Sequence, residues 1–206
     1  MKTTFGINLI YHFYHSAVTA ELKRRGFSKE VSKKIAREHR KILERAKDIG
    51  NSRLLSSYIM GSYFIALHRS TERSAEENYE IFRDGLCASK LFHKITGDAD
   101  SYLDPKKMPA RLQWSEESHK HKYENDWVVD ILPGTAEYDL GYDYHECGIC
   151  KLCQDEGCPE LAAYLCRMDY VLADIMHMKL VRTGTIAEGA PYCDFRYSRQ
   201  TDTQNK

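Results

Sequence analysis

The apolar periodicity of the chain changes near residue 111, and this change limits the folds that the sequence can adopt. Before it, apolar residues recur at the spacing of amphipathic helices. After it, short runs that alternate apolar and polar residues are typical of strands. Helices followed by strands predict an α+β fold rather than a parallel α/β sheet. With 206 residues, of which 42% are hydrophobic, the chain can bury a packed core.

Three segments carry the helical prediction for the first half. Residues 28–50 place a narrow apolar stripe on a charged background, which is typical of a helix with one face on the core. Residues 54–67 are apolar on nearly all sides, so this helix is expected to lie in the core or at a dimer seam. Residues 74–96 begin with a capping box made by Ser74 and Glu77.

The second half predicts a small antiparallel sheet of about four strands with one long helix inserted, which begins at Pro159. The expected strands cover residues 127–132, 137–147, 180–188 and 193–198. We expect four parts along the chain: a helical part at 1–96, a connector at 97–111, an α+β part at 112–198 that packs with the helices as one domain, and a frayed tail at 199–206.

Charge and cysteine content narrow the class of protein. Thirty Lys and Arg balance thirty Asp and Glu, which argues against a nucleic-acid binder. No run approaches the roughly 18 apolar residues of a membrane span, and the N-terminus shows no secretion signal. The seven cysteines are an odd number, which fits a disulfide scaffold poorly. We therefore expect a cytoplasmic protein whose partner is a small molecule.

The densest chemical signal is a C-x2-C-x2-C-x4-C-P run made by Cys147, Cys150, Cys153 and Cys158. It resembles the C-x2-C-x2-C-x3-C-P spacing that holds an iron–sulfur cluster, with one extra residue before the last cysteine. A zinc ion held by some of these thiolates and His145 is also chemically reasonable. A third interpretation is that they are reduced thiols at a strand-to-helix turn. No metal or cofactor is certain from the sequence, and these interpretations stay open.

The predicted long helix carries a second group of candidates. Cys166 and Asp169 lie one turn apart and share a helix face. An unpaired carboxylate on a buried face is costly, so Asp169 needs a partner. That partner is either a metal ion, the amino group of a substrate, Arg182 or Arg167.

The last predicted strand adds further candidates. Cys193 and Asp194 begin it, and Arg196 points to the same face as Asp194. The predicted fold brings the strand ends toward one face of the long helix. We therefore expect four catalytic candidates to meet in one region: Cys147, Cys166, Asp169 and Cys193.

The motifs together resemble the L-2-amino-thiazoline-4-carboxylate hydrolase family. The similarity runs from about residue 55 to residue 197, through YIMGSYFIALHR, SAEENYEIF, ECxxC, PELAAYLCRMDYVLAD, LVRTGTIAEG and CDFRY. The resemblance carries the family's pattern onto Cys147, Cys166, Asp169, Arg182, Thr185, Gly189, Cys193, Asp194 and Phe195. Beside this pattern, Cys150, Cys153 and Cys158 are additions in this chain.

This resemblance implies a hydrolase that opens a small cyclic amidine- or thiazoline-like ring bearing a carboxylate and yields derivatives of L-cysteine. Asp169 would protonate the ring nitrogen. The attack would come from a thiolate such as Cys193 or Cys166, or from water on a metal held by the cysteines. The residues expected to bind the substrate are Arg182, Asp194 and Arg196.

Two other functions stay open at this point. The cysteine run favours a metal-binding or iron–sulfur redox or sensor protein on the same scaffold. The ending of the chain, a glycine-containing turn followed by Cys193 and Phe195, is similar to the 4-vinyl-reductase type of small-molecule-binding domain. That likeness implies ligand binding without catalysis. The oligomeric state, including a homodimer through residues 54–67, also stays open.

Overall fold

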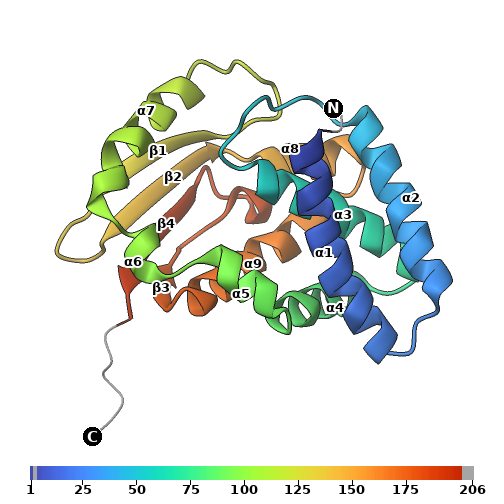
Figure 1. Ribbon diagram of the computed structural model, residues 1–206. Helices are drawn as coiled ribbons and strands as arrows, with labels where there is room; N and C mark the ends of the chain where they lie inside the picture. The colour runs from blue at the N-terminus through green and yellow to red at the C-terminus, as the bar shows by residue number, and fades with distance from the viewer. Residues whose placement is uncertain (2–3, 201–206) are drawn as a thin grey trace, which may run out of the picture.

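The computed structural model describes residue 1 and residues 4–200. The chain is α+β, as the change of periodicity predicted. Its N-terminal half is helical, and a four-stranded antiparallel sheet with two inserted helices follows. Figure 1 shows the sheet on one side of the molecule and the helices of the first half beside it, with α9 next to both.

The helix at the centre of the first half is α3 (Leu55–Thr71), and it belongs to the core. Its aromatic side chains Tyr58, Tyr63 and Phe64 are fully buried within the chain. The apolar residues 54–67, which the sequence placed either in the core or at a dimer seam, therefore lie in the core of the chain. None of the helices in the described part of the chain is long and apolar enough to cross a membrane.

Four further helices complete the helical half, three of which (the first, second and fourth of the chain) contact α3, and local signals in the sequence explain their ends. The Ser74 hydroxyl accepts from the Glu77 N–H in the predicted capping box. The predicted helix at 74–96 is interrupted because Ser89 caps a new helix and accepts from the Phe92 N–H. The four helices are α1 (Phe5–Arg24), α2 (Lys29–Arg45), α4 (Ala75–Cys87) and α5 (Lys90–Thr96).

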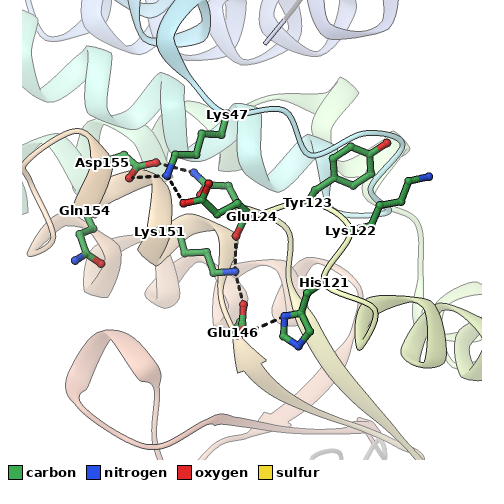
Figure 2. A pocket seen from close by; sticks show the side chains of 10 residues that line it. Lys47, His121, Lys122, Tyr123, Glu124, Glu146, Lys151, Gln154 and Asp155 are labelled. Carbon is green, nitrogen blue, oxygen red and sulfur yellow. Dashed lines mark hydrogen bonds and ion pairs between the residues drawn. The ribbon is translucent and has the colours of Figure 1, made fainter.

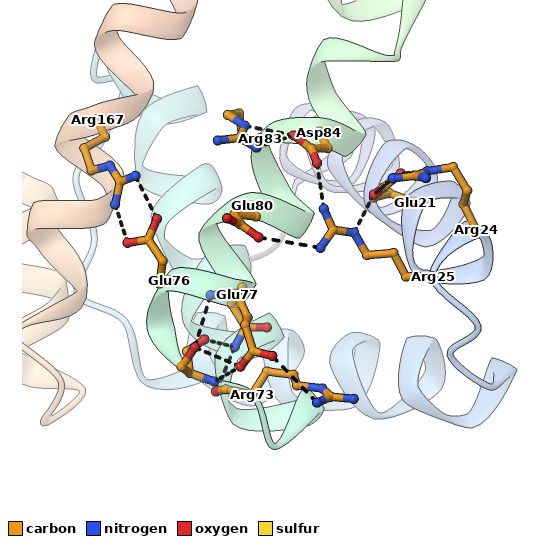
Figure 3. Close-up of polar contacts among 12 residues, drawn as sticks. Glu21, Arg24, Arg25, Arg73, Glu76, Glu77, Glu80, Arg83, Asp84 and Arg167 are labelled. Atoms are coloured by element: carbon orange, nitrogen blue, oxygen red, sulfur yellow. Dashed lines mark hydrogen bonds and ion pairs between the residues drawn. The ribbon is translucent and has the colours of Figure 1, made fainter.

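Ion pairs join the outer surfaces of these helices (Figure 3). Arg25 at the end of α1 lies 2.6 Å from both Glu21 and Asp84, and Asp84 belongs to α4. Arg167 of α9 donates to Glu76 of α4 at 2.6 Å. The Arg167 pair is exposed on both sides, so its contribution to stability is small.

Residues 97–111, predicted as a connector, are largely helical. They contain α6 (Ala99–Tyr102), the 3-10 helix η1 (Pro105–Lys107) and the start of α7 (Met108–Ser118). Pro109 lies in the first turn of α7, where a missing N–H costs nothing. Ser115 of α7 donates to the Val129 carbonyl at 2.8 Å, so α7 packs against the sheet.

The four strands are β1 (Val128–Pro133), β2 (Leu140–Glu146), β3 (Met178–Val181) and β4 (Cys193–Arg199), in the order β1-β2-β4-β3. Between β2 and β3 the chain forms α8 (Gly148–Asp155) and α9 (Leu161–Ile175). The third strand is shorter than predicted. The chain leaves the sheet after Val181 and forms the 3-10 helix η2 (Ile186–Glu188).

Strand alternation sorts the side chains of β2 and β4 onto two faces. Tyr144 pairs with Cys193 and Tyr142 with Phe195, and these residues face the helices, as Tyr197 does. The residues between them, including Asp194 and Arg196, lie on the opposite face. The inner face therefore presents aromatic side chains and one thiol to α9.

His39 is a buried titratable group in the helical half, and it predicts a pH-dependent stability. Its side chain is 2% exposed and lies 2.9 Å from the Ser62 hydroxyl. Burial, and secondarily His15, lower the pKa of His39 from 6.5 to about 4. Below pH 6.5 the unfolded chain therefore binds a proton that the folded chain excludes, and stability is lost as the pH falls toward 4.

We expect the free energy of unfolding to fall by about 2–3 kcal/mol because of His39 when the pH is lowered from 7 to 4.5. Urea unfolding gives the free energy of unfolding of wild type and of His39→Gln at both pH values. The other titrating groups affect both proteins equally, so the difference between the two losses is the contribution of His39. His119→Gln, at a partly exposed histidine, is the control. An equal loss of stability in wild type and His39→Gln would contradict the assignment.

Candidate active site

A cavity of about 220 Å³ lies between the inner face of the sheet, α9, the start of α3 and the start of α8. All four catalytic candidates from the sequence line it: Cys147, Cys166, Asp169 and Cys193. The remaining wall is mostly apolar and aromatic, with Leu54, Ser57, Tyr102, Trp127, Tyr144, Ile149, Leu165, Leu172, Met176, Phe195 and Tyr197. The structure therefore gathers the predicted thiols and carboxylate around one small space.

Cys147 reaches the cavity because α8 begins directly after β2. Cys147 is the N-cap residue of α8, and Gly148 is its first residue. A Cβ at Gly148 would lie 2.5 Å from the Asn125 carbonyl oxygen and 2.7 Å from the Trp127 ring. Only glycine allows this approach, so Gly148 fixes where the helix starts and where Cys147 points.

The environment of Cys147 favours its thiolate. The Cys150 thiol lowers the pKa of Cys147 most, and the backbone amides of Cys150 and Ile149 lower it further, against the effect of burial. These amides form no full capping hydrogen bond with the side chain, but they belong to the positive end of the α8 dipole. Cys147 is therefore the one thiol of the cavity wall whose pKa is lowered.

The other two thiols of the cavity are held neutral. Burial raises the pKa of Cys166 far above its usual range. Burial also raises the pKa of Cys193 to about 11, although the Ile186 N–H donates to its sulfur at 3.2 Å. The sequence suggested Cys166 or Cys193 as the attacking thiolate, and the electrostatics of the site favour Cys147 instead.

Asp169 pairs with Arg182, one of the four partners that the sequence left open. The Arg182 guanidinium donates to Asp169 Oδ2 at 2.8 Å and to the Cys166 carbonyl at 3.1 Å. Arg167, the other candidate arginine, is bound to Glu76 instead. Burial raises the pKa of Asp169 to about 6, and the Arg182 charge limits this rise. Asp169 can therefore hold or release a proton near neutral pH.

The three residues predicted to bind the substrate lie outside the cavity wall. Arg182 is 5% exposed and is occupied by Asp169. Asp194 accepts the Thr183 and Gly184 N–H groups at 2.9 Å, and Arg196 donates to Asp143 at 2.7 Å. Strand alternation is the reason, since Asp194 and Arg196 point away from the face that carries Cys193. None of the residues that line the cavity is basic.

The loop before β4 positions Cys193, and it contains residues that the family resemblance had singled out. Thr185 is buried and donates to Glu188 at 2.7 Å. Gly189 ends η2 with a φ of 90°, a left-handed conformation that favours glycine. Together they shape the turn that presents the Ile186 N–H to Cys193. Their role is therefore to support the cavity.

The four cysteines of the 147–158 run lie as two pairs, at opposite ends of α8. Cys147 is next to Cys150 at the start, and Cys153 is next to Cys158 past the end. His145 lies 2.8 Å from Asp130 instead of joining them. Among the described residues, no group of three or more His, Cys, Asp or Glu side chains is placed to hold a metal ion. A metal site at these cysteines stays a prediction from the sequence.

A second, more open hollow of about 690 Å³ lies between the segment before β1, the end of β2 and α8 (Figure 2). Its charged groups bind one another. Lys47 lies 2.6 Å from Glu124, Lys151 donates to Glu146, and His121 lies 3.3 Å from the same Glu146. None of the predicted site residues lines this hollow, so the smaller cavity is the better candidate.

The aromatic residues that line the cavity were not predicted as site residues from the sequence. Tyr144 and Tyr197 face inward from β2 and β4, Trp127 precedes β1, and Tyr102 ends α6. The alternation of Tyr142 and Tyr144 with the polar residues Asp143 and His145 along the predicted strand was the available signal for Tyr144. No comparable signal existed for Tyr102, because α6 is too short to show a periodicity.

The family model of L-2-amino-thiazoline-4-carboxylic acid hydrolases matches residues 52–197. The chain belongs to this family. Every residue that lines the small cavity falls inside the matched segment. The family's name indicates a hydrolase. No curated protein and no solved structure matches the chain.

Proposed function

We propose that the protein hydrolyses a small cyclic amidine-like substrate with a thiazoline-type ring, using Cys147 and Asp169. The observation that carries this proposal is the single cavity shared by Cys147 and Asp169 inside the segment that matches the family. The opposite shifts of their pKa values support it. The thiol is made easier to ionise and the carboxyl easier to protonate, which suits a nucleophile and a general acid.

The cavity suits the amidine part of such a substrate. Its volume of about 220 Å³ is below the range of about 300–1,000 Å³ for drug-sized ligands, so a single small ring fits best. Aromatic walls, and the carboxylate that Asp169 becomes once it has given up its proton, favour the amidinium form of the ring. Because the wall has no basic residue, a substrate carboxylate would point out of the cavity.

The reaction then follows from the two side chains. Asp169 in its acid form gives a proton to the ring nitrogen, which makes the carbon between nitrogen and sulfur more electrophilic. The Cys147 thiolate adds to this carbon, and the adduct collapses with cleavage of one ring bond. Water then cleaves the bond between Cys147 and that carbon. One proton of this water returns to Asp169 and the other leaves with the product. The products are therefore the ring-opened molecule and the free Cys147 thiolate, with one water consumed.

The thiol chemistry also supports the cytoplasmic location that we propose. All seven cysteines are free in the structure. A reducing compartment keeps thiols in this form, whereas an oxidising one favours disulfides.

The direct test is incubation of the purified protein with L-2-amino-thiazoline-4-carboxylate, with ring opening followed by mass spectrometry. We expect a product heavier by one water. Absence of ring opening by folded, reduced protein would contradict the proposal.

A comparison of two analogues tests how the substrate is held. We expect 2-amino-thiazoline, which lacks the carboxylate, to keep a kcat within about tenfold of the parent compound, a difference of at most about 1.4 kcal/mol. Thiazolidine-4-carboxylate, which lacks the amidine, should show no turnover. The reverse order would mean that the carboxylate, and not the amidine, is bound in the cavity.

A further inference from the structure

The cysteine run of residues 147–158 contains a feature that hydrolysis does not use. Cys150 does not line the cavity, yet it lies against Cys147, which does. We propose that Cys147 and Cys150 form a reversible dithiol–disulfide site at the start of α8, at the wall of the cavity.

The backbone places these two residues at a distance that a disulfide spans. Cys147 is the N-cap of α8 and Cys150 its third residue, and the Lys151 N–H already donates to the Cys147 carbonyl at 3.1 Å. Helix geometry puts Cα atoms three residues apart at about 5 Å. Disulfides span about 4.4–6.8 Å between Cα atoms. The expected Cα separation of Cys147 and Cys150 therefore lies within the range that a disulfide spans.

The two sulfurs also differ in the way that thiol–disulfide exchange requires. Cys147 opens onto the cavity, and the Cys150 thiol and the first amides of α8 favour its thiolate. Cys150 is partly exposed, and the neighbouring Cys147 together with burial raises the pKa of its thiol. Cys147 is thus the attacking sulfur, and Cys150 is the sulfur that resolves the mixed disulfide.

The oxidant for this site is a low-molecular-weight disulfide, R–S–S–R, small enough to reach the cavity. The Cys147 thiolate attacks one of its sulfurs, and R–S⁻ leaves. Cys150 then gives its proton to solvent, its sulfur attacks Cys147, and the second R–S⁻ leaves. The two cysteines lose two electrons in total, and the small disulfide is reduced to two thiols.

The remaining cysteines of the region are poorer partners. Cys153 and Cys158 are also adjacent, but they are only 0% and 8% exposed and line no part of the cavity. Cys166 and Cys193 also line the cavity, but they lie on α9 and β4, and burial holds both thiols neutral. The geometry therefore selects Cys150.

Closure of this disulfide would have a consequence that rests on the proposed function. It would remove the Cys147 thiolate from the cavity, so the oxidised protein would lose hydrolysis and recover it on reduction.

Anaerobic treatment of the whole reduced protein with 2-hydroxyethyl disulfide tests the site, followed by alkylation of free thiols and peptide mass mapping. Of the seven cysteines, we expect two to escape alkylation and to appear as one linked peptide joining Cys147 to Cys150. Dithiothreitol should restore all seven. In Cys150→Ser, the mixed disulfide should remain on Cys147, while Cys87→Ser, at an exposed cysteine of α4, should behave as wild type.

Several results would overturn the proposal. These are full alkylation of all seven cysteines after treatment, a stable mixed disulfide on Cys147 of the wild type, or a linked peptide joining other cysteines. The mapping on the wild type decides the matter even where a variant fails to fold. Because it does not depend on turnover, a failure of the proposed hydrolysis is seen separately, as reduced protein without activity.

Discussion

Cys147→Ala is expected to lower kcat for ring opening by at least about a thousandfold, while the protein stays folded. The sulfur of Cys147 is the one thiol of the cavity wall whose pKa lies below its usual value. Removing it leaves the cavity with the thiols of Cys166 and Cys193, which are held neutral by burial. Neither can replace the thiolate at neutral pH.

Steady-state kinetics with the parent substrate measure this effect, with thermal unfolding as the check on folding. Cys158→Ala is the matched control, because it removes a buried thiol near the other end of α8. We expect its kcat to stay within about tenfold of wild type. Comparable losses in both variants would mean that Cys147 acts through the fold of α8 and not as a nucleophile.

Asp169→Asn is expected to lower kcat by about a hundredfold to ten-thousandfold, the usual range for the loss of a general acid. The amide cannot give up a proton, but its oxygen can still accept from Arg182. The exchange therefore removes the acid while largely keeping the contact. Asp84→Asn, in an ion pair with Arg25 far from the cavity, is the matched control.

The pH profile separates this role from a structural one. Because burial raises the pKa of Asp169 to about 6, the acid form is lost as the pH rises through 6. We therefore expect the kcat of the wild type to fall on the alkaline side of about pH 6. The residual activity of Asp169→Asn should lack this fall. A variant that keeps the same alkaline limb would show that another group supplies the proton.

Much of the fold was predictable because local signals and packing agree along most of the chain. Ser74 with Glu77 and the all-round apolar residues 54–67 indicated helices that the structure contains. The helix α8 was not predicted, because its eight residues are rich in cysteine and too few to show a helical period. In the structure this segment packs against α3 and α9, contacts that its sequence does not indicate.

Part of the candidate site was also predictable, because strand ends and a helix face can be read from the sequence. The prediction that Cys147, Cys166, Asp169 and Cys193 share one region followed from strand ends and one helix face, and one cavity holds all four. Asp194 and Arg196 were assigned to the same site as Cys193, although alternation along β4 places them on the other face. The state of each thiol depends on its burial and, for Cys147, on the start of α8, and no sequence pattern indicates either.

The rate at which iodoacetamide alkylates each cysteine, with and without substrate, tests the central claim most directly. If Cys147 is the nucleophile of the substrate cavity, it reacts faster than the more exposed Cys87, and saturating L-2-amino-thiazoline-4-carboxylate slows its reaction alone. A Cys147 that reacts no faster than Cys87, or that the substrate does not protect, would contradict the account.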